Sequence, residues 1–411
     1  MQYKLLNIHK LLANIATNLV GAFIPIIVLE ATGSLILAIT FFVLMYLVRM
    51  LFVFLFRRMF ETKPQIMLLI RIVPILLYSV FVILISVNVW VGVIGTVVFS
   101  GLNNAFKRMP TEIILNYSSL QQNDEGSLGF TRLIEQMGVV VSFLVGGYLL
   151  GINKIMVVVI SLTIYAISVV PLVLYYLKCK QDKTFNKDAV SNAQLTFKEK
   201  DNKKYNYGKV LGKKIINIYA ITYFVYCVID SFADLFNIYM FTTTGSYAVA
   251  GVFSAVYNGS FGVGSFLYGK IAEKRDIQTD VSVCCVLVGA SAISIAFTPI
   301  LWVRYILFAV LGLSYSPIPI FNFQRLITKS RILGKSNTAL RYREQSSNLS
   351  IITASLPGLF GTIIPCFILI ALCMFASSAL IPYHEEKSRR LLVDYLQFNE
   401  IQSQSKIKPF K

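Results

Sequence analysis

Two aspartates, Asp230 and Asp234, lie within one long apolar stretch of the sequence, where a carboxylate has few ways to be solvated. Their spacing of four residues places both on the same face of an α-helix. Two ionised carboxylates that close repel each other, which favours the sharing of a proton. The pair therefore suits proton binding and release, or binding of a cationic group, although Asp234 could instead lie in a wet interface near Thr242, Thr243 and Thr244.

Two arginines also lie inside apolar stretches, Arg49 and Arg71, each roughly 10 Å from one end of its stretch at 1.5 Å per helical residue. If they face a cavity, they favour an anionic solute or headgroup; the favoured alternative is that they snorkel or pair with Glu61. Asn14 and Asn18 share one helix face and are candidate hydrogen-bond partners for a solute, or residues of a helix contact.

Two short charged motifs resemble each other, Arg132-Leu-Ile-Glu135-Gln and Arg341-Tyr-Arg-Glu344-Gln. In each, an arginine precedes a glutamate by three residues, which places the two side chains side by side on a helix. Their matched positions suggest a gate between two halves of the chain, while local ion pairs at two helix starts are the simpler interpretation.

The elements that must position these residues are membrane helices. Of the 411 residues, 56% are hydrophobic and 14% are charged, too few polar residues to cover a water-soluble globule of this length. A helix needs about 20 apolar residues to cross a bilayer, and the sequence offers twelve such stretches. Stretches such as Ile155 to Val159 are apolar on every side, which excludes the alternation of a membrane β-barrel.

The positive charge of the chain follows the predicted topology. The formal net charge of +18 comes from 38 lysines and arginines, most of them in the amino terminus, the even-numbered connections and the tail. Lys154 and Arg304 are the basic residues of the opposite side. Because positive loops stay in the cytoplasm, we expect a protein of the cell membrane with both termini on the cytoplasmic side. The positive charge is thus explained by topology, and nucleic-acid binding is disfavoured.

A polar segment divides the chain. Residues 178–214 contain eleven lysines and no apolar period, which predicts a cytoplasmic linker. We therefore expect a six-helix bundle over 1–177, a second over 215–383, and a cytoplasmic tail over 384–411 that forms a short amphipathic surface helix.

The two predicted bundles repeat parts of each other. Thr32-Gly33-Ser34 matches Thr244-Gly245-Ser246, and at the same offset Glu61 matches Glu273. The two charged motifs around Arg132 and Arg341 match at nearly that offset. Parallel six-helix repeats explain both matches.

Twelve helices, a basic central linker and this repeat resemble the major facilitator superfamily, over essentially the whole chain. The family's loop motif Gly-x-x-x-Asp-Arg-x-Gly-Arg-Arg is similar to the segment from Gly269 through Glu273 to Arg275, with Glu and Lys replacing Asp and Arg. In the first half, the stretch around Glu61 lacks the glycine. The resemblance implies that these loops place an acid where it can latch a neighbouring helix; the alternative is that Arg57, Arg58 and Arg275 are solvated anchors at the cytoplasmic interface.

A second motif is similar to the family's antiporter sequence Gly-x-x-x-Gly-Pro-x-x-Gly-Gly. Its small residues here are Gly138, Ser142, Gly146 and Gly147, and Phe143 replaces the proline. Small residues spaced by four allow close helix packing, which is favoured over ligand contact. The Thr-Gly-Ser turn also resembles bacterial drug-efflux relatives.

These resemblances imply an all-α secondary transporter that works by alternating access, with proton-coupled efflux of amphipathic compounds as the leading interpretation. Import of a polar solute and flipping of an anionic lipid are alternatives, and a non-transporting receptor or complex subunit is an alternative of another class. We expect a monomer in the bilayer, with a small-molecule substrate and protons as partners. No catalytic constellation, metal cluster or cofactor motif is evident.

Overall fold

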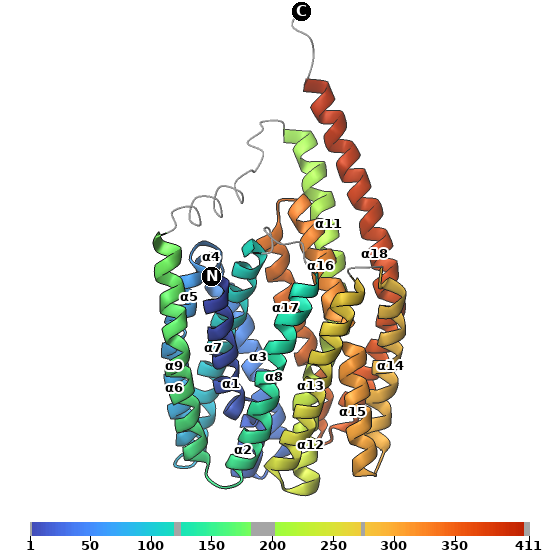
Figure 1. The fold of residues 1–411 in the computed structure, drawn as a ribbon. Coiled ribbons are helices and arrows are strands. Elements are labelled where there is room, and N and C mark those ends of the chain that lie inside the picture. The colour runs from blue at the N-terminus through green and yellow to red at the C-terminus, as the bar shows by residue number, and fades with distance from the viewer. Residues whose placement is uncertain (1, 119–124, 182–201, 273–275, 407–411) are drawn as a thin grey trace, which may run out of the picture.

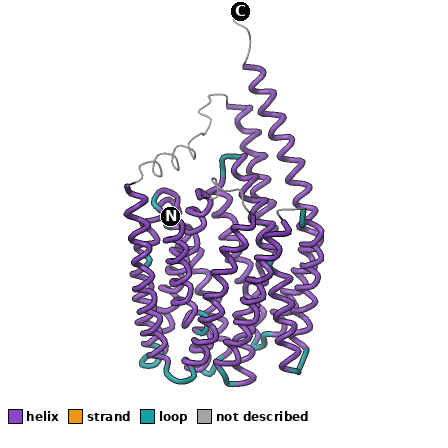
Figure 2. Tube along the Cα trace, in the orientation of Figure 1, coloured by secondary structure: helices purple, strands orange, loops and turns teal. Residues whose placement is uncertain are grey.

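The computed structural model describes residues 2–118, 125–181, 202–272 and 276–406, and those residues form helices and short connections without a β-strand. Figure 2 shows the same, with short loops between long helices. In chain order, the elements are α1 (Gln2–Gly21), α2 (Ile24–Thr32), α3 (Leu35–Leu55), α4 (Arg57–Thr62), α5 (Pro64–Ile70), α6 (Ile72–Leu84), α7 (Val89–Ser118), α8 (Glu125–Leu150), α9 (Lys154–Gln181), α11 (Asn202–Tyr226), η1 (Cys227–Ser231), α12 (Phe232–Thr244), α13 (Tyr247–Ala272), α14 (Gln278–Phe297), α15 (Leu301–Tyr315), α16 (Pro317–Ile332), α17 (Ser336–Ser355), η2 (Leu356–Phe360) and α18 (Ile364–Lys406).

The long helices stand roughly side by side, and both chain ends lie at the same end of the molecule (Figure 1). We call this the terminal end and the opposite one the far end. We also refer to α1 to α9 as the N-terminal helices and to α11 to α18 as the C-terminal helices. The two sets touch through α8 with α13 and through α3 with α17.

Ten helical segments are long and apolar enough to cross a membrane, which makes the chain a multi-pass membrane protein. Within the described residues, α13 and α17 do not reach the same apolar threshold. Helix α17 is the more polar of the two, with Arg341, Arg343, Glu344 and Asn348 in its sequence. Twelve crossings therefore stay a prediction.

The two repeated turns have the same backbone structure. Gly33 and Gly245 both adopt a left-handed conformation, with φ of 67° and 65°, which a residue with a side chain rarely adopts. The N–H of Gly33 bonds the carbonyl of Leu29 at 2.7 Å, and that of Gly245 bonds Phe241 at 2.8 Å. The threonine hydroxyl of each turn accepts a bond from the following serine N–H at 3.3 Å. This shared geometry supports an internal repeat.

Proline explains several breaks within the long helices, because it cannot donate a helical hydrogen bond. Pro25 starts α2, Pro317 starts α16, and Pro357 lies in η2. Pro74 explains the break at Arg71, between α5 and α6. Because proline has no N–H, the carbonyl of residue 70 lacks its helical donor.

One break corrects a sequence-based expectation. Between α11 and α12 the chain forms a 3₁₀ turn, η1, that contains Asp230, while Asp234 lies in the first turn of α12. The two aspartates therefore do not sit on one continuous α-helix, and the argument from 3.6-residue spacing does not apply to them.

Glycines bring helices close at two faces of α8. A Cβ on Gly146 would lie 2.5 Å from the carbonyl oxygen of Leu19, so this side of α8 packs against the backbone of α1. On the other side, a Cβ on Gly147 would lie 2.7 Å from the carbonyl of Tyr247 in α13, and one on Gly251 would lie 2.4 Å from that of Phe143. The glycines of α8 thus lie at contacts both within the N-terminal helices and between the two sets.

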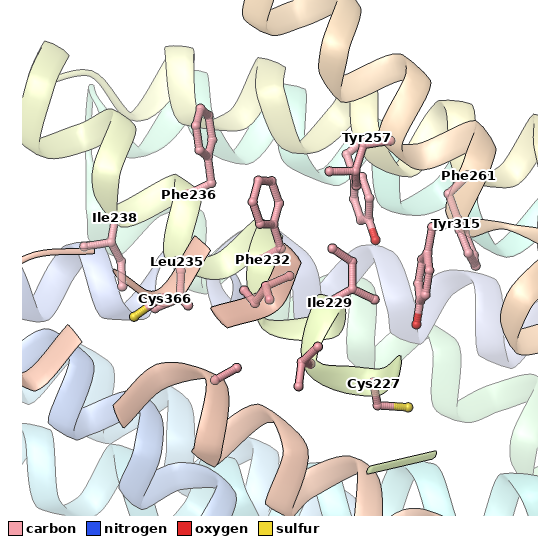
Figure 3. Close-up of a cluster of buried hydrophobic side chains, with 14 of the residues drawn as sticks. Cys227, Ile229, Phe232, Leu235, Phe236, Ile238, Tyr257, Phe261, Tyr315 and Cys366 are labelled. Atoms are coloured by element: carbon pink, nitrogen blue, oxygen red, sulfur yellow. The ribbon is translucent and has the colours of Figure 1, made fainter. Parts of the chain in front are cut away.

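Aromatic side chains dominate the core of the C-terminal helices. Phe232 and Phe236 of α12 stack with ring centroids 6.1 Å apart, and Phe236 lies 4.4 Å from the ring of Phe308. Figure 3 shows this cluster beside η1, with the hydroxyl ends of Tyr257 and Tyr315 near Ile229 and Cys227. Cys227 is a buried free thiol within this apolar packing.

The predicted amphipathic surface helix at the C-terminus is wrong. Residues 384–406 continue α18 as one helix that extends beyond its neighbours at the terminal end (Figure 1). Glu385 is buried and accepts hydrogen bonds from Lys329 at 2.8 Å and from the hydroxyl of Tyr219 at 2.7 Å. These contacts fix the base of the extension to α16 and α11.

Candidate functional site

A buried glutamate of α17, Glu344, joins the two sets of helices. Its carboxylate forms an ion pair with Arg49 of α3 and lies 3.2 Å from Arg108 of α7. The side chain of Glu344 has no exposed surface, and that of Arg49 is 6% exposed. Two charges removed from water in this way are stable only because they compensate each other.

A second ion pair runs beside the first with the charges reversed. Arg343 of α17 lies 2.8 Å from Glu112 of α7, which also lies 3.4 Å from Arg108. Adjacent residues of α17 thus supply one acid and one base to the N-terminal helices. The result is one charge network that crosses between the sets.

Both glutamates of the repeated motifs, and the arginine of the second motif, bind partners in other helices. Arg341 lies 3.4 Å from Glu61 of α4, and Glu135 lies 2.6 Å from Lys10 of α1. The simpler interpretation of a local pair between Arg341 and Glu344 is therefore wrong. Arg132 has no ion pair within the described part of the chain, although its charge acts on Glu135.

The expectation that Arg49 or Arg71 pairs with Glu61 is also wrong. Arg71 is 1% exposed and donates from Nε to the Oδ1 atom of Asn103 at 2.8 Å. Its guanidinium lies over the ring of Tyr165, 5.5 Å from the centroid. Its Nη2 is buried and makes no hydrogen bond among the described residues. Arg71 thus has neutral partners and a free donor.

Asp230 and Asp234 lie next to tyrosines. The Tyr315 hydroxyl donates to Asp230 Oδ1 at 2.6 Å, whereas Asp234 has no hydrogen bond among the described residues. Both aspartates act electrostatically on Tyr46 of α3, as do Arg49 and Arg108. The aspartates therefore lie close to the charge network that crosses between the sets.

The two predicted asparagines of α1 are half-buried. Asn18 donates to the carbonyl of Asn14 at 2.8 Å. The sequence analysis missed a third asparagine, Asn348 of α17, which is fully buried. Neither Nδ2 nor Oδ1 of Asn348 has a partner among the described residues, so the amide has unused hydrogen-bonding capacity. The low hydropathy of α17 is the signal that could have pointed to it.

The predicted loop motif lies at the terminal end of α13. Gly269 is buried there, whereas Glu273 and Arg275 lie outside the described residues. Of the small residues of α8, Ser142 is buried and its hydroxyl donates to the carbonyl of Gly138 at 2.7 Å. A Cβ on Gly138 would lie 2.6 Å from the side chain of Leu11, which again places α1 against this face.

A separate polar contact lies at the far end. Glu30 of α2 lies 2.8 Å from Lys154 of α9 and accepts a hydrogen bond from the hydroxyl of Tyr247 in α13. These residues line a cavity of about 460 Å³ together with Gly147 and Ser246. The repeated Thr-Gly-Ser turns flank this contact. Because Glu30 belongs to the N-terminal helices and Tyr247 to the C-terminal helices, it too joins the two sets.

Among the described residues, no group of His, Cys, Asp and Glu side chains is arranged to hold a metal ion. Most of the acidic side chains described above instead pair with arginines and lysines. Their arrangement suits electrostatic recognition and proton binding within a helical bundle.

No family model and no curated protein matches this sequence. Among solved structures, a variant of the fucose:proton symporter FucP from E. coli aligns with a TM-score of 0.56 at 13% identity, over 93% of this chain and 98% of that one. The human organic anion transporter MFSD10 (TETRAN) aligns with a TM-score of 0.58 at 9% identity, over 92% and 98%. The chain therefore shares its overall fold with these two transporters.

Both alignments extend over nearly the whole of each chain, so the likeness in fold covers the entire helical arrangement rather than one part. Identities this low concern the fold alone. The resemblance to drug-efflux members is not among these findings.

Proposed function

We propose that the protein is a secondary active transporter that moves a small solute across the cell membrane by alternating access. In this proposal the chain crosses the bilayer twelve times, with α13 and α17 as polar crossings. Residues 1–177 and 215–383 form two six-helix bundles that rock against each other. Polar crossings suit this function, because they are stable where they line a wet path between the bundles.

The observation that supports alternating access most directly is the pair of contacts at opposite ends. Toward the terminal end, Glu344 binds Arg49 and Arg108; at the far end, Glu30 binds Tyr247. Each contact joins the two proposed bundles. Breaking one while keeping the other would open the path to one side only, which alternating access requires.

Proton coupling is the second part of the proposal. Asp230 and Asp234 lie near each other and are both half-buried, and the Tyr315 hydroxyl donates a hydrogen bond to Asp230. A carboxyl group in such a setting can exchange a proton as the surroundings change from open to closed. We assign proton binding to this pair.

The direction of transport and the orientation rest on sequence. The basic connections place both termini in the cytoplasm. Export of amphipathic compounds follows only from the resemblance to efflux members and stays a prediction. One structural neighbour is named for fucose and protons and the other for organic anions, and neither substrate transfers at such low identity.

Reconstitution tests the proposal. Proteoliposomes with purified protein are given a pH gradient and a panel of solutes, and proton flux is measured with an internal pH dye. We expect solute-dependent flux that is lost in Asp230→Asn and kept in Asp394→Asn, since Asp394 is exposed in the extension of α18. Flux that survives in Asp230→Asn removes that residue from coupling, and absence of flux with every solute favours the receptor alternative.

A further inference from the structure

Three ion pairs leave two cations of the N-terminal helices, one buried and one half-buried, without a carboxylate partner among the described residues. Glu135 binds Lys10, Glu112 binds Arg343 and Glu344 binds Arg49. Arg108 shares the last two glutamates. Arg71 and Lys107 have no ion pair among the described residues.

The two unpaired cations lie on the same side of α7. Asn103 and Lys107 are four residues apart on this helix and therefore share a face. Asn103 holds the Arg71 guanidinium at 2.8 Å, so Lys107 lies one turn along α7 from that contact. The charge of Arg71 acts on Lys107, as do those of Arg49 and Arg108.

The nearby acid is already occupied. Glu135 is the carboxylate that acts most strongly on Lys107, and its Oε1 atom accepts from Lys10 at 2.6 Å. Lys107 is half-buried, so its ammonium is within reach of water. The Nη2 atom of Arg71, in contrast, is buried and has no hydrogen-bond partner among the described residues. An uncompensated cation in a membrane interior costs several kcal/mol. A bound anion would offset that cost.

We propose that Lys107 and Arg71 form a binding site for the anionic group of the transported solute, a carboxylate or a phosphate. The inference rests on the proposed transport function, since it names the substrate class of the same molecule. Arg71 suits this role because its Nε bond to Asn103 and its contact with Tyr165 fix the guanidinium plane. Lys107 supplies a mobile point charge beside it.

Binding is tested without transport, on full-length protein in nanodiscs. The probes form matched pairs, glucose 6-phosphate with glucose and benzoate with benzamide, and inorganic phosphate is added as a minimal anion. Affinity is measured from the shift in the thermal unfolding midpoint with probe concentration. We expect at least one anion to bind and its neutral partner not to bind.

The variants assign the site. Lys107→Gln should weaken anion binding about tenfold or more, because a charge-assisted contact is lost. Lys107→Arg should keep it, and so should Lys63→Gln, which removes an exposed lysine outside the site. In the absence of any probe, Lys107→Gln should unfold at a higher temperature than wild type, since it removes a half-buried charge that has no counter-charge and that lies near the buried Arg71.

Each contrary result overturns the inference. These results are equal binding of neutral and anionic partners, anion binding that survives in Lys107→Gln, binding of none of the anions, or a lower unfolding temperature in ligand-free Lys107→Gln. Transport is read separately. If only neutral or cationic solutes are transported, the transporter proposal stands and the anion site is contradicted. If anions bind but no solute is transported, the anion site stands and the transporter proposal is contradicted.

Discussion

Arg49 of α3 and Glu344 of α17 form a buried ion pair although 295 positions separate them in the chain. The pair connects the N-terminal to the C-terminal helices in a region where neither charge reaches water. In the proposed cycle, this contact must break each time the terminal end opens. Its energy is therefore part of the barrier between the two states.

Removal of the Glu344 charge should destabilise the protein. In Glu344→Gln, Arg49 loses its carboxylate and Arg108 keeps only Glu112, so a buried charge stays uncompensated at a cost of about 3–5 kcal/mol. We expect a lower unfolding temperature in nanodiscs and loss of transport. Asp394→Asn, which alters an exposed carboxylate, should change neither, and an unchanged unfolding temperature in Glu344→Gln would show that the pair carries no stability.

A double replacement separates stability from gating. Arg49→Met combined with Glu344→Leu removes both charges and leaves Arg108 with Glu112, so the unfolding temperature should recover relative to Glu344→Gln. Transport should stay low, because the two apolar side chains would be exposed to water when the terminal end opens. The ion pair, in contrast, can separate into water and form again. Recovery of transport along with stability would contradict a gating role.

The far-end contact predicts an effect on accessibility. Tyr247→Phe removes the hydrogen bond to Glu30 while Lys154 keeps its ion pair with that glutamate. The far end should therefore open more often, and a cysteine introduced at Asn18, in a background without native cysteines, should react several-fold faster with a membrane-impermeant maleimide. Tyr148→Phe is the matched control, since Tyr148 lines the same cavity and is 65% exposed. Equal rates in both variants would remove Tyr247 from the gate.

Sequence reasoning located the charged residues and the repeat, but did not assign partners across helices. The spacing in Arg341-x-x-Glu344 correctly implies that the two side chains are neighbours on α17, yet rotation of the helix directs one to Glu61 and the other to Arg49. That rotation depends on packing between distant segments, which local spacing does not contain. The Thr-Gly-Ser turns were easier, because a left-handed glycine is a local requirement.

The breaks within helices are also of two kinds: some follow from the local sequence, and others depend on packing between distant segments. The break at Pro25 follows from the missing N–H of one residue. The 3₁₀ turn Cys227–Ser231 contains no proline, so nothing in its own sequence marks it. The extension of α18 likewise depends on Glu385, whose partners Lys329 and Tyr219 come from two other helices.

The buried contact of Glu385 gives a prediction with a neighbouring control. Glu385→Gln leaves Lys329 with its bond to Ser388 but without a counter-charge, so we expect a loss of stability of about 3–5 kcal/mol. Glu386→Gln removes a solvent-accessible acid whose ion pairs among the described residues are with Arg389 and Arg390 of its own helix, so it should leave the unfolding temperature nearly unchanged. Thermal unfolding of the two variants checks the difference. Equal losses would mean that the tail is not fixed through Glu385.

The contact between α8 and α13 depends on glycine, and this can be tested within one helix. In Gly251→Ala, the new Cβ would lie 2.4 Å from the carbonyl oxygen of Phe143, so the two helices must separate, at a cost of about 1–3 kcal/mol. In Gly259→Ala, the Cβ would meet the side chain of Val140 at 3.4 Å, close to ordinary contact. The gain in helix propensity should then leave stability unchanged or raise it by up to about 1 kcal/mol. Because α8 and α13 stay in contact while the proposed bundles rock, Gly251→Ala should also slow transport more than Gly259→Ala. Equal effects of the two alanine variants on unfolding and on flux would show that this close approach is not needed.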